Sequence, residues 1–122
     1  MTENRFDLED RTYSFAQKVT VFLKTLPNTI SSFEYKKQLI RSSGSVGANY
    51  IEANEALGKK DFLLRIKICR KEAKESAYWL RLLLSTNDNI DQAAGTILLN
   101  EATELKKIFS SIIIKTQIPN NK

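Results

Sequence analysis

The strongest constraint on the fold is a heptad pattern between residues 60 and 86. Apolar or small side chains recur there in alternating steps of four and three residues, at Phe62, Ile66, Cys69, Ala73, Ser76, Leu80 and Leu83. This spacing places all of them on one face of an α-helix, and that face has to pack against other helices to leave water. The pattern therefore predicts a helix over residues 60–86 with one long buried stripe.

Similar spacing predicts three more helices, over residues 9–26, 32–57 and 91–116. Their expected inward positions are Phe15, Val19, Phe22 and Leu26, then Leu39, Ser43, Val46, Tyr50, Ala53 and Leu57, and finally Ala94, Leu98, Leu105, Ile108 and Ile112. The connections of about two to five residues are too short to cross the length of such helices, so consecutive helices must be antiparallel neighbours. The 122-residue chain is expected to be one all-α domain over residues 1–122, an up-down-up-down antiparallel four-helix bundle.

Side chains typical of helix ends lie near these boundaries. The expected caps are Asp7 for the first helix, a Ser31–Glu34 capping box for the second, Gly58 at the end of the second, and an Asn89–Gln92 box for the fourth. Pro27 is expected to stop the first helix.

Two glycines lie within the helix expected over residues 32–57. Gly44 and Gly47 belong to the segment RSSGSVGANYIEA, and each costs a helix interior roughly 1 kcal/mol relative to alanine. Close approach of another backbone is the usual reason for such glycines. We therefore predict that Gly47 is a contact between helices and that the neighbouring serines are small packing residues.

Side chains suited to catalysis are scarce. The chain has no histidine, the commonest general base and metal ligand. The single Cys69 lies in the heptad stripe, which is typical of a buried, unreactive thiol in a reducing compartment. Glu52 with Glu55, and Glu101 with Glu104, lack the Glu-x-x-His motifs that di-iron bundles add to such pairs. We expect no enzymatic activity, no metal and no cofactor.

Neither a membrane span nor a secretory signal is expected. No run of 18 apolar residues occurs, and the N-terminal MTENRFDLED is polar and acidic where a signal peptide is basic and then apolar. The sequence predicts a cytoplasmic protein without a membrane partner.

Positive charge is concentrated in residues 59–81. This segment carries the whole net charge of +5, and the rest of the chain is neutral. The basic side chains expected along its outer side are Lys60, Lys67, Lys71, Lys74 and Arg81, joined near the Arg81 end by Lys37 and Arg41 and near the Lys60 end by Lys106, Lys107 and Lys115. Such a face indicates a polyanion, an acidic protein partner or simply a solvated surface. Tyr78 in the same helix could stack on a nucleic-acid base.

A second line of apolar residues lies beside the heptad stripe. Together, the two make the apolar surface of this helix wider than packing within one bundle requires. The second line consists of Ile68, Trp79 and Leu82. Trp79 either fills the bundle core or faces another subunit. Asn49 is either a structural polar lock or a contact across a subunit boundary, since a buried amide needs a hydrogen-bond partner. We assign all four residues to an expected oligomer interface.

Several segments together resemble one family. These are RSSGSVGANYIEA, KDF at 60–62, KEAKESAYWLRLLL at 71–84, YSFAQKV at 13–19 and the Leu26–Pro27 pair. They are similar to the four-helix bundle proteins encoded in intervening sequences of bacterial 23S ribosomal RNA genes. The resemblance implies a left-handed bundle, a ring-shaped homo-oligomer of five subunits and no known enzymatic activity. A more distant similarity is to the accessory protein of diversity-generating retroelements, a basic pentamer that works with a reverse transcriptase and nucleic acid.

The leading hypothesis is a non-enzymatic, homo-oligomeric bundle, expected to be a pentamer, that binds RNA or DNA through its basic face. Ring symmetry would repeat that face around an axis and strengthen its field. The alternative is a scaffold that docks an acidic protein partner or a nucleic-acid enzyme such as a reverse transcriptase. An unidentified catalytic role comes third.

Overall fold

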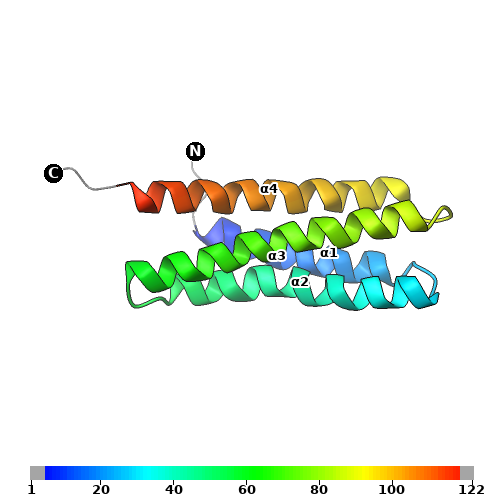
Figure 1. The fold of residues 1–122 in the computed structure, drawn as a ribbon, viewed down its shortest axis with the longest axis horizontal. Helices are drawn as coiled ribbons and strands as arrows, with labels where there is room; N and C mark the ends of the chain where they lie inside the picture. The colour runs from blue at the N-terminus through cyan, green and yellow to red at the C-terminus, as the bar shows by residue number, and fades with distance from the viewer. Residues whose placement is uncertain (1–4, 119–122) are drawn as a thin grey trace.

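The computed structural model describes residues 5–118, with side chains described from Leu8 onward, and these residues form four α-helices. The helices are α1 (Arg5–Leu23), α2 (Ile30–Asn54), α3 (Lys59–Thr86) and α4 (Gln92–Gln117). Successive helices run antiparallel and lie side by side (Figure 1), so the predicted up-down-up-down bundle is confirmed. None of these four helices is long and apolar enough to cross a membrane.

The core consists of the apolar stripes of all four helices. The heptad stripe of α3 is confirmed, because all of its members are buried except Phe62, which is half-buried against the core. The α2 stripe is buried from Leu39 to Ala53. Leu57 is fully exposed, since α2 ends at Asn54 rather than continuing to residue 57.

The buried stripe of α4 lies one residue away from the predicted positions in its C-terminal half. Phe109 and Ile113 are buried, whereas Ile108 and Ile112 are only half-buried. Adjacent apolar residues at these positions fit either face of a helix equally well. In the structure, the ring centre of Phe109 lies 6.0 Å from that of Tyr50 on α2, so Phe109 rather than Ile108 faces the core.

The expected capping box of α2 is wrong. Thr29, not Ser31, is the N-cap, and its hydroxyl accepts a hydrogen bond from the backbone N–H of Ser32 at 3.2 Å. Ser32 is buried, and its own hydroxyl donates to Oδ1 of Asn87 at the end of α3, 3.1 Å away. Both serines therefore lie within the first turn of α2, and Ser32 links this turn to the end of α3.

The other three caps also differ from the prediction. Asp91, not Asn89, caps α4 by accepting a hydrogen bond from a first-turn backbone N–H. Gly58 directly precedes α3 in an extended conformation instead of ending α2. Asp7 lies within α1, which begins at Arg5.

Gly47 is a contact between helices, as predicted. A Cβ atom at this position would lie 3.0 Å from Oγ1 and 3.3 Å from Cβ of Thr12 on α1. Thr12 is buried, and its hydroxyl donates to the carbonyl of Leu8, which fixes the side chain. Gly44 has no such contact within this chain, because a Cβ there would meet no atom within 4 Å.

Replacing Gly47 with leucine should destabilise the bundle by about 1–3 kcal/mol, because the larger side chain overpacks the contact with Thr12. The matched control is Gly44→Leu, which adds helix propensity at an exposed position where a Cβ would meet no atom of its own chain within 4 Å. Urea denaturation of dilute protein, followed by circular dichroism, measures both. A Gly47→Leu variant as stable as Gly44→Leu would contradict the contact.

Candidate nucleic-acid interface

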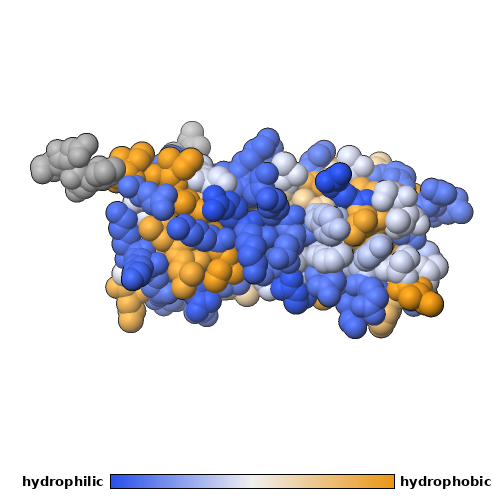
Figure 2. Space-filling view, in the orientation of Figure 1, coloured by the Kyte–Doolittle hydropathy of each residue, from blue (hydrophilic) through white to orange (hydrophobic). Residues whose placement is uncertain are grey.

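The expected basic side of α3 faces solvent along its whole length. Lys60, Lys67, Lys71, Lys74 and Arg81 are all exposed, on the side of α3 opposite its buried stripe. Figure 2 shows hydrophilic side chains gathered over the middle of the face that contains α3. The position of these cations follows from the heptad, because burying one face of a helix turns the opposite face towards water.

Part of this basic side borders a surface depression of about 430 Å³ between α3 and α4. We call it the basic depression, and its lining consists of five cations and one hydroxyl: Lys67, Arg70, Lys71, Lys74, Lys106 and Ser110. Three of the predicted lysines are thereby brought together with Arg70, which the sequence analysis did not assign. Lys106 lies opposite the middle of α3 rather than near its Lys60 end, where we expected it.

Most cations of the basic depression lack a carboxylate partner. Among residues 8–118, Lys67, Arg70, Lys74 and Lys106 form no ion pair. Lys71 Nζ lies 3.8 Å from Oε2 of Glu72. Like charges held in one depression repel each other and attract anions, so this surface concentrates the positive field of the bundle.

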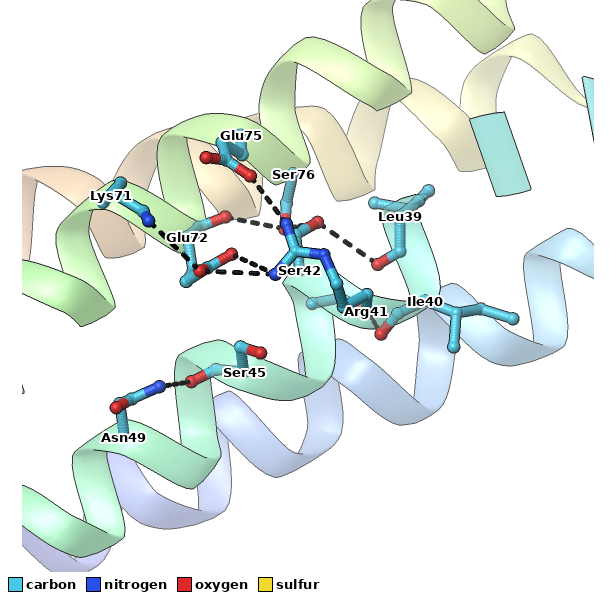
Figure 3. Close-up of polar contacts among 11 residues, drawn as sticks. Leu39, Ile40, Arg41, Ser42, Ser45, Asn49, Lys71, Glu72, Glu75 and Ser76 are labelled. Atoms are coloured by element: carbon cyan, nitrogen blue, oxygen red, sulfur yellow. Dashed lines mark hydrogen bonds and ion pairs between the residues drawn. The ribbon is translucent and has the colours of Figure 1, made fainter. Parts of the chain in front are cut away.

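Arg41 reaches from α2 to two carboxylates on α3 (Figure 3). Its Nη2 donates to Oε1 of Glu75 at 2.8 Å, and its Nη1 lies 3.3 Å from Oε1 of Glu72. The Glu72 side chain is only 7% exposed, so Arg41 neutralises a nearly buried charge. Burial lowers the pKa of Arg41, but the hydrogen bonds and charges of these two carboxylates raise it by more.

Lys37 also has partners within its own helix. Its Nζ lies 3.9 Å from Oε2 of Glu34 and 5.4 Å from the ring centre of Phe33. The two α2 cations assigned to the basic face are therefore placed beside acidic or aromatic groups, unlike most cations of the basic depression.

Small buried side chains bring α2 and α3 together beneath the Arg41 ion pair. The hydroxyl oxygens of Ser42 and Ser76 lie 2.9 Å apart, and Ser76 also donates to the backbone carbonyl of Glu72 (Figure 3). Residues of this size allow close approach of the two backbones, and α2 and α3 form the most extensive helix contact in the bundle. The prediction that these serines serve packing agrees with this geometry.

The apolar line expected at an oligomer interface lies on α3 beside α2. Ile68, Trp79 and Leu82 are half-buried. Trp79 packs against the core, with its ring 5.9 Å from Tyr35 and 5.0 Å from Tyr78. Contacts within the bundle thus bury much of the Trp79 side chain.

Asn49 finds its hydrogen-bond partners within the chain. Its Oδ1 accepts from Nη1 of Arg65 on α3 at 3.0 Å, and its Nδ2 donates to the carbonyl of Ser45 at 2.9 Å. Of the two interpretations of this residue, the contacts favour a polar lock between α2 and α3.

A different apolar surface is exposed on the outer side of α2, and the sequence analysis missed it. Ile40 and Ile51 are 51% and 53% exposed, with the exposed small residues Gly44 and Ala48 between them. Their spacing of four, four and three residues places them on one face, which we call the outer α2 face. The same spacing is visible in the sequence, but the prediction for this segment concerned only the contact at Gly47.

Three of the side chains weighed for catalysis have other roles or are unreactive. Burial raises the pKa of the Cys69 thiol to about 12, so it is protonated at neutral pH and a poor nucleophile. Glu101 pairs with Arg11 at 2.7 Å, and Glu104 lies 3.6 Å from Lys107. Within the described part of the chain, no three His, Cys, Asp or Glu side chains are grouped to hold a metal ion.

These features define a class of protein, an antiparallel four-helix bundle with a small-residue α2–α3 contact and a basic outer side on α3. The chain belongs to the 23S rRNA-intervening sequence protein family, whose model matches residues 5–111. It is also similar to the crystal structure of a protein with unknown function from the S23 ribosomal protein family of Bacteroides thetaiotaomicron. The two are 37% identical with a TM-score of 0.77, over 86% of this chain and 96% of that one. No curated protein matches the chain.

Replacing Arg41 with methionine should lower the free energy of unfolding by about 1–3 kcal/mol, because the nearly buried Glu72 carboxylate loses its nearer cation and keeps only Lys71, 3.8 Å away. The control, Lys37→Met, removes an exposed cation whose ion pair contributes about 0–1 kcal/mol. Adding Glu72→Gln to Arg41→Met should restore part of the loss. Chemical denaturation measures all three variants, and equal stability of the two single variants would contradict a structural role for Arg41.

Proposed function

We propose that this chain is a nucleic-acid-binding protein that holds the phosphate backbone at the basic depression between α3 and α4. The observation that carries the proposal is a lining of five cations without a carboxylate. Both the family and the related crystal structure bear names that refer to ribosomal RNA or the ribosome, which supports a link to RNA without specifying a ligand.

The chemistry of the lining fits phosphate. Arg70 can donate two parallel hydrogen bonds to one phosphate group, which a lysine cannot. Lys67, Lys71 and Lys74 supply mobile point charges along α3, and the Ser110 hydroxyl can donate a further hydrogen bond. Because the remainder of the chain is neutral, the field that attracts the backbone originates at this surface.

Binding of this kind is expected to depend on salt and to ignore base sequence. Each phosphate that a cation neutralises releases counterions and adds about 0.7–0.9 to the slope of log affinity against log salt concentration. Phosphate contacts carry no information about the bases. An acidic protein partner would instead bind at a fixed stoichiometry and compete with nucleic acid for the same cations.

Reversing two charges of the depression with Lys67→Glu and Lys74→Glu should weaken binding to every sequence and lower the salt slope by about 1.4–1.8. The matched control is Lys18→Glu with Lys24→Glu, which changes the net charge equally at exposed positions on α1 and directly after it. Fluorescence anisotropy with labelled RNA and DNA at several salt concentrations measures both variants. No binding by the unsubstituted chain at low salt, or equal weakening by both variants, would contradict the proposal.

We also propose that the chain self-associates through the outer α2 face. Ile40 and Ile51 are exposed on this face, and Gly44 has no neighbour in its own chain to account for its small size. A second copy packed on this face would bury both isoleucines and use the space at Gly44 for close approach. The family resemblance favours a ring of five copies, in which several basic depressions would act on one nucleic acid.

Size exclusion with light scattering tests self-association. The unsubstituted chain is expected to elute at a multiple of 13.9 kDa, and Ile40→Glu with Ile51→Glu should reduce it to one copy, because charges on an apolar interface are costly to bury. The control is Val21→Glu with Ile97→Glu, two exposed apolar positions on α1 and α4. An unsubstituted chain that elutes only at 13.9 kDa would contradict the proposal.

A further inference from the structure

An exposed aromatic ring continues the line of cations on the outer side of α3. Lys67, Lys71, Lys74, Tyr78 and Arg81 follow one another in steps of four, three, four and three residues, so they share one helix face. The line is about 21 Å long at the helical rise per residue. Tyr78 is 53% exposed and lies along this line between Lys74, which borders the basic depression, and Arg81, which lies beyond it.

The tyrosine ring is supported from one side by other aromatic rings. Trp79 packs edge-on against it, with ring centres 5.0 Å apart and planes inclined at 73°. Trp79 in turn contacts Tyr35 of α2, with ring centres 5.9 Å apart, and packs against the core. Tyr78 is therefore an exposed ring on a rigid support, which lowers the entropy lost when a flat ligand stacks on it.

We propose that the preferred ligand of this surface is single-stranded nucleic acid, one base of which stacks on Tyr78 while its phosphates contact the neighbouring lysines. This inference rests on the proposed nucleic-acid binding and adds the type of strand to it. The bases of a duplex stack on one another and turn their faces away from a protein surface. An exposed single strand, in contrast, offers its base faces to aromatic side chains.

The order of groups along α3 supports a single strand further. A phosphate-only surface for duplexes needs cations alone, whereas interleaved cations and aromatic rings are typical of single-strand grooves. Every base has a stacking face, so a stacked Tyr78 would retain the sequence tolerance expected of the lysines. RNA and DNA strands share this chemistry, and both are included in the test.

The experiment compares Tyr78→Ala and Tyr78→Phe on four probes: oligo-U, oligo-dT, an abasic deoxyribose-phosphate strand of equal length, and a DNA duplex. Tyr78→Ala should weaken binding to oligo-U and oligo-dT about 5- to 150-fold, the effect of losing one stacked base. Its binding to the abasic strand and the duplex should not change, because these probes offer phosphates but no free base face. Tyr78→Phe keeps the ring and should bind all four probes as the unsubstituted chain does.

The outcomes separate this inference from the proposal beneath it. If no probe binds the unsubstituted chain at low salt, both the proposed nucleic-acid binding and the single-strand inference are overturned. If all four probes bind and Tyr78→Ala leaves oligo-U and oligo-dT unaffected, or weakens the duplex equally, only the single-strand inference is overturned. A further measurement needs no substitution: the unsubstituted chain should prefer oligo-dT to the abasic strand, and equal affinity for these two probes would also overturn the inference.

Discussion

Close packing of α2 on α3 depends on small side chains at their contact, and the placement of the charged groups follows from it. Ser42 and Ser76 approach to 2.9 Å, so the two backbones lie near enough for Arg41 to reach across to α3. The same rotation of α3 that buries Ser76 turns Lys71 and Lys74 to solvent. A larger residue at Ser42 or Ser76 would therefore separate the helices and displace the ion pair that lies beside them.

The charges of α3 are divided between two sides of one helix. Glu72 and Glu75 lie towards α2, where Arg41 binds them, and the lysines of the basic depression lie towards solvent and α4. Arg41 binds both carboxylates, and Lys71 is the one lysine of the basic depression that lies within 4 Å of either of them. The ion pair thus stabilises the α2–α3 contact and at the same time preserves the positive field of the outer side.

The fold could be predicted from the sequence because helical spacing and short connections leave few arrangements. The predictions that were wrong concern features that depend on contacts between residues far apart in the sequence. Ile108 and Phe109 are both apolar, so spacing alone does not show which of them faces the core, where Phe109 is buried and packs against Tyr50. Similarly, the sequence predicted a basic line on α3, but the addition of Lys106 depends on how α4 is positioned along α3.

The two glycines within α2 show why helix propensity alone does not predict which residues contact a neighbouring helix. Each glycine lowers the stability of the helix by a similar amount. Gly47 nevertheless packs against the buried Thr12 of α1, whereas no atom of the chain lies within 4 Å of a Cβ placed at Gly44. Gly44 also lies on the outer α2 face, whereas Tyr78 lies on the outer side of α3. A second copy at Gly44 would therefore occupy a side of the bundle separate from the cations and Tyr78, so self-association and nucleic-acid binding can act together in one assembly.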